Sequence, residues 1–267
     1  MTARVDLYDS AYANFARPVE AAVRAETYGE DIGQSSWITA AEWASYFAML
    51  GLAADSEVLE VGCGSGGPAA YLARAVGCRV VGVDVNEAGI ANATALAERS
   101  GIAGRARFRV VDASGPLPFA DASFDAVVAN DAMCHVADRA GALSEWLRVL
   151  RPGGRMLYTD AMVVTGIVTN AELATRSSIG FYLYVPPGEN ERLIRAAGFE
   201  LLRVVDLTES AATVAGRWRD ARARHREGMV AIEGEANFEG LQRFLDCVHV
   251  VSRERRLSRF LYLARKG

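Results

Sequence analysis

Alternating strands and helices along the middle of the chain predict an α/β fold built on a parallel sheet. Short apolar runs rich in valine and leucine recur between residues 57 and 161, and helical patterns separate them. With 267 residues, the chain can bury a sizeable core. We therefore expect helices on both faces of the sheet and a ligand site at the carboxyl ends of its strands.

The apolar runs predict seven strands in order along the chain. Their expected ranges are 57–61, 79–84, 105–111, 124–130, 155–161, 199–207 and 255–264. The expected helices between them are 68–76, 86–100, 138–150 and 187–197. Asn86 can cap the second of these helices. Arg151-Pro152-Gly153-Gly154 should stop the third, because proline cannot continue a helix and glycine turns the chain.

Three segments lie outside this alternation: residues 1–50, 163–185 and 208–254. We expect them to form a lid over a cofactor-binding core, residues 51–162, in one domain that residues 255–267 complete as a last strand. Thr39 and Glu42 predict a capping box for a helix near residue 40. An earlier helical face is formed by Tyr8, Tyr12, Phe15, Val19 and Val23.

Composition narrows the classes of function. The formal net charge of −4 offers no electrostatic footprint for nucleic acid or an anionic membrane. No apolar run is long enough to span a bilayer, and residues 1–9 lack a signal core, so we expect a cytoplasmic protein. The four cysteines have no metal-ligand spacing and are expected to be reduced thiols, with no metal required. The apolar face of the N-terminal helix fits packing either on its own chain or on a second copy, so the sequence does not decide whether the protein forms an oligomer.

The stretch from Val58 to Gly67 is an apolar strand that ends on a carboxylate and runs into a glycine turn. Glycines lack a Cβ atom and so let backbone N–H groups approach a cofactor. Gly62, Gly64 and Gly67 fit the GxGxxG spacing of dinucleotide sites, so an NAD-type dehydrogenase is one alternative. Glu60 argues against it, because a carboxylate there repels a pyrophosphate and favours a cationic ligand.

Two further acids follow the next strands. Asp84 ends the second strand, where a carboxylate can accept hydrogen bonds from both ribose hydroxyls. Asp112 follows the third, where it can accept from an adenine amino group while the N–H of Ala113 serves a ring nitrogen. With Glu60, these acids predict a cationic ligand that carries a nucleoside, as S-adenosylmethionine does.

In this order, Glu60-x-Gly62-x-Gly64-x-Gly66, Asp84, Asp112-Ala113, Phe124-Asp125 and Arg151-Pro152-Gly153-Gly154 resemble the motifs of class I S-adenosylmethionine-dependent methyltransferases. The resemblance covers residues 57–162. It implies a seven-stranded Rossmann-like methyltransferase sheet with helical lid segments, in which the last two strands form an antiparallel pair. It also implies S-adenosyl-L-methionine as cofactor and S-adenosyl-L-homocysteine as product. The expected cofactor contacts are Gln34, Ser35, Glu60, Gly62, Cys63, Gly64, Gly66, Asp84, Val85, Asp112, Ala113, Asn130 and His135.

Two segments narrow the resemblance to small-molecule methyltransferases. Residues 130–139 contain Asp131 and His135, spaced as in phosphoethanolamine and sarcosine/dimethylglycine N-methyltransferases, and are also similar to the loop of antibiotic-sugar O-methyltransferases. Residues 28–37 resemble the segment of the phosphobase enzymes that contacts the cofactor. This resemblance is the reason for expecting Gln34 and Ser35 among the cofactor contacts. Those enzymes hold a phosphate with cations after the fifth strand. Here few cations precede Arg176, which favours a neutral or weakly cationic, more apolar acceptor.

Three side chains are candidate catalytic groups. His135 can take the proton of a hydroxyl acceptor near neutral pH, and Asp160 can orient its imidazole. Asp131 can instead hold the ammonium of an amine acceptor. Each also has a purely structural interpretation, as a loop histidine or as a carboxylate that caps a turn. Tyr12, Trp37 and Tyr182 are expected to line the acceptor site, since such pockets are largely apolar.

The sequence therefore predicts S-adenosylmethionine-dependent methylation of an amine or hydroxyl on a small molecule of secondary metabolism. Methylation of an electron-rich or alkene carbon is an alternative, as are the dehydrogenase and a catalytically silent cofactor-binding protein. A nucleic-acid methyltransferase is disfavoured, because residues 130–133 are not the Asn/Asp-Pro-Pro-Tyr/Phe tetrad used on exocyclic base amines.

Overall fold

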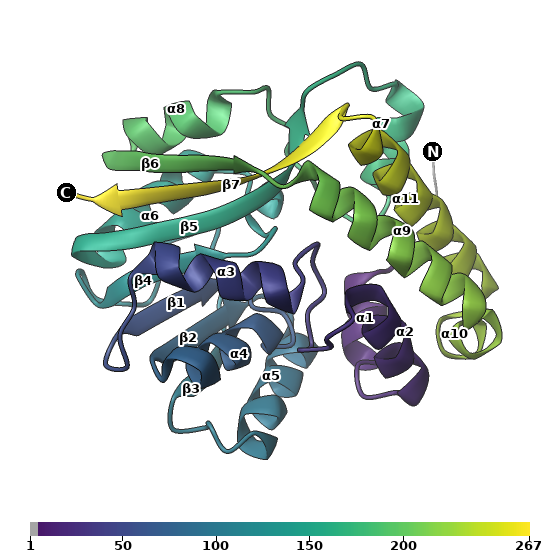
Figure 1. Ribbon diagram of the computed structural model, residues 1–267, viewed down its shortest axis with the longest axis horizontal. Coiled ribbons are helices and arrows are strands. Elements are labelled where there is room, and N and C mark those ends of the chain that lie inside the picture. Colours follow the sequence, from purple (N-terminus) through teal and green to yellow (C-terminus); the bar gives the residue numbers. More distant parts are fainter. Residues whose placement is uncertain (1–4) are drawn as a thin grey trace.

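The computed structural model describes residues 5–267 and contains a seven-stranded sheet in the order β3-β2-β1-β4-β5-β7-β6 (Figure 1). The first five strands are parallel, and β7 runs antiparallel to both β5 and β6. This confirms the predicted sheet and its antiparallel last pair. The strands are β1 (Glu57–Val61), β2 (Arg79–Asp84), β3 (Ala106–Val110), β4 (Phe124–Ala129), β5 (Leu150–Val164), β6 (Phe199–Asp206) and β7 (Leu257–Lys266).

Helices cover both faces of the sheet. Successive side chains of a strand point to opposite faces and so enter two different hydrophobic cores. Val58 faces a cluster that includes Trp43, whereas its neighbour Leu59 faces a cluster that includes Trp146. The helices over these faces are α3 (Ala40–Leu50), α4 (Gly67–Val76), α5 (Glu87–Arg99), α6 (Arg139–Val149) and α8 (Glu189–Ala196).

A third core lies beyond one end of the sheet, where further helices gather (Figure 1). Trp218 and Phe244 are among its buried members. Its helices are α1 (Tyr8–Ala13), α2 (Pro18–Tyr28), α9 (Thr208–Arg224), α10 (Arg226–Glu233) and α11 (Glu235–Arg253), with the short α7 (Asn170–Arg176) beside them. We call this group the helical layer. Residues 1–4 of the expected N-terminal lid segment lie outside the described part of the chain.

The N-terminal segment is helical, as predicted, but its apolar face is divided between two helices. The chain forms two helices, since it leaves the helical conformation between Asn14 and Arg17 and Pro18 starts α2 at a position that proline favours. Phe15 therefore lies between the helices, with the guanidinium of Arg24 stacked 4.1 Å from its ring centroid.

Only half of the predicted capping box forms. The hydroxyl of Thr39 accepts a hydrogen bond from the N–H of Glu42 at 3.2 Å. The carboxylate of Glu42 turns away from the helix start and accepts from Arg259 and from the hydroxyl of Tyr46, both at 2.6 Å. A buried guanidinium binds a carboxylate more strongly than a backbone N–H does.

The segment 151–154 is part of a strand. The helix before it ends at Val149, as expected, but β5 begins at once at Leu150 and its pairing with β4 is irregular between Phe124 and Ala126. Gly153 has φ of 77°, which suits glycine at this irregularity.

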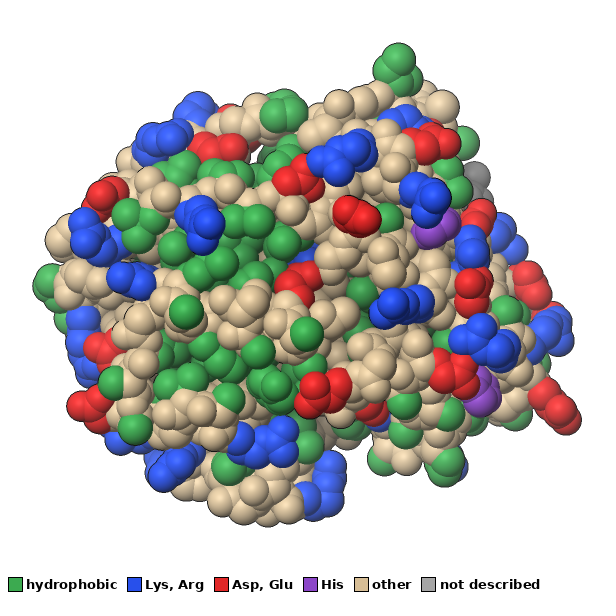
Figure 2. Space-filling view, in the orientation of Figure 1, with side chains coloured by type: hydrophobic (Ala, Val, Ile, Leu, Met, Phe, Trp, Pro, Cys, Tyr) green, Lys and Arg blue, Asp and Glu red, His purple; other side chains and the backbone are tan. Residues whose placement is uncertain are grey.

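The surface mixes charges of both signs. On the face drawn in Figure 2, basic and acidic side chains lie interspersed. In the part of the chain that the structure describes, no helix combines the length and apolar character needed to cross a membrane.

Candidate active site

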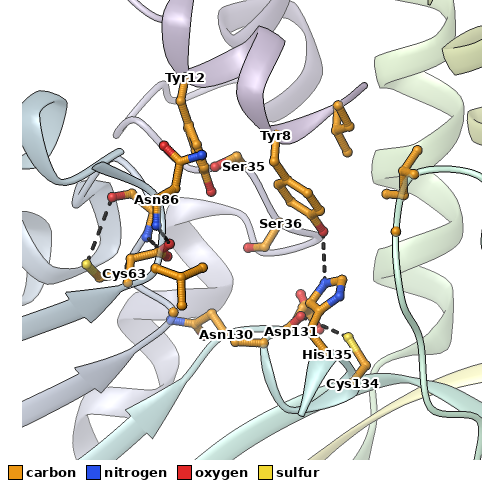
Figure 3. Close-up of a pocket in the computed structure, with 18 of the residues that line it drawn as sticks. Tyr8, Tyr12, Ser35, Ser36, Cys63, Asn86, Asn130, Asp131, Cys134 and His135 are labelled. Carbon is orange, nitrogen blue, oxygen red and sulfur yellow. Dashed lines mark hydrogen bonds between the residues drawn. The ribbon is translucent and has the colours of Figure 1, made fainter. Parts of the chain in front are cut away.

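A cavity of about 740 Å³ lies at the carboxyl ends of the central strands and extends to the helical layer (Figure 3). The glycine turn after β1, the ends of β2 and β3 and the loop after β4 form one part of its wall. Segments from the helical layer form the other. The lining segments are 5–9, 33–37, 60–64, 83–86, 111–114, 130–136 and 176–182, together with Tyr12, Pro68, Trp218 and Phe244. Within these segments Gln34, Met133, Ser177 and Ser178 do not reach the cavity.

The glycine turn brings its backbone to the cavity wall. Gly62 and Gly64 have φ of 70° and 51°, a region that glycine enters without steric penalty. A Cβ atom at Gly62 would lie 2.4 Å from that of Ala132, so the turn also packs closely on the loop after β4. Gly66 caps α4 and does not line the cavity, unlike Gly62 and Gly64.

Glu60 and Asn130 present unused acceptors beside this turn. Glu60 is 1% exposed, and its Oε1 accepts a hydrogen bond from Asn130 Nδ2 at 3.1 Å. Neither Glu60 Oε2 nor Asn130 Oδ1 has a hydrogen-bond partner among residues 5–267. Burial raises the pKa of Glu60 to about 8. Two unsatisfied oxygens fit a cationic donor such as the ammonium of an amino acid, because its positive charge favours the carboxylate form of Glu60, which accepts.

The two acids at the next strand ends are fixed in place by backbone groups. Asp84 accepts from the N–H of Gly64 at 2.8 Å and from that of Asn86 at 2.9 Å. Asp112 accepts from the hydroxyl and the N–H of Ser114, and these hydrogen bonds lower the pKa of Asp112. Both acids line the cavity, as do the predicted Val85 and Ala113.

His135 is held as a neutral imidazole. Its Nδ1 lies 2.8 Å from the carbonyl oxygen of Phe181, which can only accept, so Nδ1 carries the proton. In the neutral ring, Nε2 then accepts from the hydroxyl of Tyr8 at 2.9 Å, the bond dashed in Figure 3. Burial lowers the pKa of His135 and raises that of Tyr8. Near neutral pH, a basic ring nitrogen thus faces a neutral phenol at the cavity wall.

Asp131 lines the cavity but is the counter-ion of a buried arginine. Its Oδ1 accepts from Arg259 Nε at 2.8 Å and from the hydroxyl of Thr159 at 2.9 Å. Its Oδ2 accepts from the N–H of Trp37 at 3.1 Å. The backbone of Asp131 has φ of 56°, a strained conformation for a residue other than glycine, and this network holds it there.

Asp160 does not orient the imidazole, contrary to the sequence expectation. Its carboxylate is fully buried, does not line the cavity, and binds Arg139 at 2.5 Å and Asn190 at 3.0 Å. A buried guanidinium needs a counter-charge, and Asp160 supplies it. The carbonyl of Phe181 orients His135 instead.

Gln34 also serves a structural purpose in this structure. Its side chain accepts from the N–H of Ile32 at 2.9 Å and donates to the carbonyl of Glu30 at 3.1 Å. It does not line the cavity, whereas its neighbour Ser35 does. The predicted acceptor-site residues Tyr12, Trp37 and Tyr182 all line it.

Tyr8 and Arg176 are the site residues that sequence reasoning missed. The sequence predicts only that Tyr8 lies on a helical face, because its partner His135 is 127 positions away and no local pattern joins them. For Arg176 the sequence shows only a cation that follows a cation-poor segment. The structure places its side chain, 2% exposed, at the cavity.

With this geometry established, comparison with known proteins identifies the family. Residues 59–158 match the model of a methyltransferase domain. The chain is 34% identical over 187 residues to the O-methyltransferase resE of Aspergillus sclerotiorum, a match that covers 68% of this chain and 69% of that protein. The chain belongs to the methyltransferase family. The matched residues include the glycine turn, which therefore belongs to a methyltransferase domain and not to a dehydrogenase.

Other methyltransferases match over a smaller share of their length. Methyltransferase GfsG of Streptomyces halstedii is 37% identical over 169 residues, 61% of this chain and 59% of that protein. The 27-O-demethylrifamycin SV methyltransferase of Amycolatopsis mediterranei is 34% identical over 60% of each chain. The chain thus spans about three fifths of the length of these two relatives.

Solved structures share the fold. Phosphoethanolamine N-methyltransferase 2 of Haemonchus contortus, in complex with S-adenosyl-L-methionine, has a TM-score of 0.80 at 21% identity and covers 97% of this chain, with 60% of that chain matched. The [4+2]-cyclase SpnF has a TM-score of 0.76 at 24% identity over 99% of both chains. Because one of these neighbours is a cyclase, the fold alone does not specify the reaction.

Proposed function

We propose that this methyltransferase transfers a methyl group from S-adenosyl-L-methionine to a hydroxyl of a small specialised metabolite. The observation that carries this proposal is the neutral His135, whose Nε2 accepts from Tyr8 at the wall of the cavity. Loss of a proton is what makes a hydroxyl a good nucleophile, and a neutral imidazole is suited to take that proton. The names of resE and the rifamycin relative, both O-methyltransferases, support this acceptor.

The cofactor would be held by the residues already described. Glu60 Oε2 and Asn130 Oδ1 would accept hydrogen bonds from its ammonium, Asp84 from its ribose, and Asp112 with Ala113 would bind its adenine. When bound, S-adenosylmethionine supplies a methyl group made electrophilic by the sulfonium. The chain's contribution is to orient the acceptor and to keep water away, since methyl transfer depends largely on positioning.

The proton has a defined path. An acceptor hydroxyl that donates a hydrogen bond to Tyr8 Oη passes its proton to that oxygen, while Tyr8 passes its own proton to His135 Nε2. The protonated imidazole keeps its Nδ1–H on the carbonyl of Phe181. The raised pKa of Tyr8 suits this relay, because a tyrosinate does not accumulate.

An amine acceptor is less well supported. Asp131, the residue expected to hold an ammonium, has both carboxylate oxygens bound to Arg259, Thr159 and Trp37. C-methylation remains the alternative that the sequence left open. A sterol 24-C-methyltransferase of Gibberella zeae is 35% identical over 167 residues, although only 43% of that protein is matched.

Methyl-labelled S-adenosylmethionine tests the proposal. The purified protein is incubated with the labelled cofactor and an extract of small molecules, and mass spectrometry follows the label. An O-methylated product, made much more slowly by His135→Gln and Tyr8→Phe, is the expected result. His225→Gln is the matched control, because His225 pairs with Glu26 on the outside of the protein. A labelled product made equally fast by His135→Gln would overturn the role of His135.

A further inference from the structure

Arg176 differs from the other buried arginines of the described chain. Arg139 pairs with Asp160, Arg222 with Glu233, and Arg259 with both Asp131 and Glu42. Arg176 is equally buried but has no carboxylate within ion-pair distance among residues 5–267. Its Nε and Nη1 also have no hydrogen-bond acceptor in that part of the chain.

Aromatic rings surround this guanidinium. Its central carbon lies 4.4 Å from the ring centroid of Tyr182, 5.0 Å from that of Phe244 and 5.8 Å from that of Trp37. Ring faces attract a cation, but they do not replace the acceptors that buried N–H groups need. An unpaired buried charge destabilises a fold. Its position on the cavity wall suggests that a ligand completes its hydrogen bonds.

We propose that Arg176 binds a carboxylate on the methyl acceptor. This inference rests on the proposed function, since it names the acceptor class of the same site. A guanidinium donates charge-assisted hydrogen bonds, and a carboxylate accepts these more strongly than a neutral oxygen does. Among the cavity-lining residues of the described chain, Arg176 is the one Lys or Arg. A single positive charge balances a carboxylate, whereas a phosphate monoester would leave a charge uncompensated in an apolar site.

The position of Arg176 also sets the shape of the acceptor. Tyr182 contacts both Arg176 and the base: its ring centroid lies 4.4 Å from the guanidinium carbon of Arg176 and 4.5 Å from the ring centroid of His135. A carboxylate on Arg176 and the nitrogen that takes the proton are therefore neighbours of the same tyrosine ring. The acceptor is a hydroxycarboxylic acid with an apolar body, rather than the neutral or cationic molecule that the cation-poor sequence suggested.

Matched acids and amides test this without knowledge of the natural acceptor. Phenylacetate, 3-phenylpropionate and 4-phenylbutyrate are each titrated by calorimetry into protein saturated with S-adenosylhomocysteine, and so are their primary amides. We expect at least one acid to bind about tenfold or more tightly than its own amide, as for an ion pair shielded from water. The inference is overturned if no acid binds more tightly than its amide.

Variants assign the preference to Arg176. Arg176→Met should abolish the preference for the acid, keep the affinity for S-adenosylhomocysteine, and melt at a higher temperature than the wild type because an unpaired buried charge is gone. Arg176→Lys should keep part of the preference. Arg203→Met, at an exposed arginine of β6, is the matched control and should change neither. An acid preference that survives in Arg176→Met would contradict the inference.

Failure of this inference and failure of the proposed function give different results. The absence of any labelled methyl product would count against the function, whereas an intact acid preference would still support the carboxylate site. A labelled product that is retained by an anion exchanger at pH 8 but not at pH 2 would support both proposals. A labelled product that carries no acidic group would support the function and overturn the role of Arg176.

Discussion

At the scale of single residues, the burial of Glu60 makes the stability of the ligand-free protein depend on pH. The folded state holds a proton on Glu60 up to about pH 8, whereas an ordinary glutamate loses it near 4.5. Between these values the folded state binds more protons than the unfolded state, so stability falls as pH rises. Urea unfolding at pH 5 and at pH 8.5 should show this fall, and Glu60→Gln should flatten it. An unchanged pH dependence in Glu60→Gln would contradict the assignment.

His135 predicts the acidic limb of the pH–rate profile. Burial lowers the pKa of His135 below its usual 6.5, so the base form is complete near neutral pH and is lost only in more acidic solution. We expect kcat/KM to rise with pH through a value below 6.5 and then to level off. His135→Gln should lower kcat by about 10²–10⁴-fold, the usual contribution of a general base. A limb that persists in this variant would point to another group.

At the scale of elements, Asp131 ties the loop after β4 to β7 and to the segment before α3. Asp131→Ala leaves Arg259 with Glu42 as its remaining carboxylate and should lower the free energy of unfolding by about 3–5 kcal/mol. Urea unfolding measures the loss. The matched control is Asp138→Ala, at an exposed N-cap of α6, which should cost about 1 kcal/mol. Equal losses in the two variants would contradict a buried ion pair at Asp131.

Gly67 joins α4 to the segment that precedes α3. A Cβ atom at this position would lie 2.2 Å from the carbonyl oxygen of Ile32 and 2.5 Å from the carbonyl carbon of Gly33. Gly67→Ala must therefore displace backbone, and we expect a loss of at least about 1–3 kcal/mol in stability, together with weaker binding of S-adenosylhomocysteine. Gly104→Ala, where the space is open, is the control for both measurements. Unchanged binding in Gly67→Ala would show that the loop adjusts freely.

At the scale of the whole molecule, the cavity joins two parts of the chain that have separate hydrophobic cores. The glycine turn belongs to the sheet, whereas residues 5–9, Trp218 and Phe244 belong to the helical layer or pack beside it. A ligand in the cavity contacts both and should stabilise their association.

Hydrogen exchange can detect this coupling. At a concentration of S-adenosylhomocysteine about 100 times its Kd, the folded state should gain about 2.7 kcal/mol. We expect amide exchange to slow in residues 5–15 and 33–37 and in the glycine turn. The outer strand β6 lies outside the cavity lining and should show no local slowing, which makes it an internal control. Protection confined to the glycine turn would indicate that the helical layer does not close over the ligand.

The sequence by itself determined the strands of the sheet and the cavity wall that the glycine turn and the acids after the strands form. Local patterns reveal the succession of strands along the chain, the glycine turn, and the acids Glu60, Asp84 and Asp112. They do so because a strand, a turn and the acid after it are neighbours in the chain. The parallel arrangement then brings those acids to one edge of the sheet.

Only the tertiary structure decided what each polar side chain does. Asp160 serves Arg139, Asp131 serves Arg259, and Tyr8 meets His135, through pairings between residues 21 to 128 positions apart. A local pattern cannot reveal such pairs, because packing of the helical layer against the sheet sets which charges are buried together. For the same reason, only the tertiary structure shows that no carboxylate of the described residues lies beside Arg176.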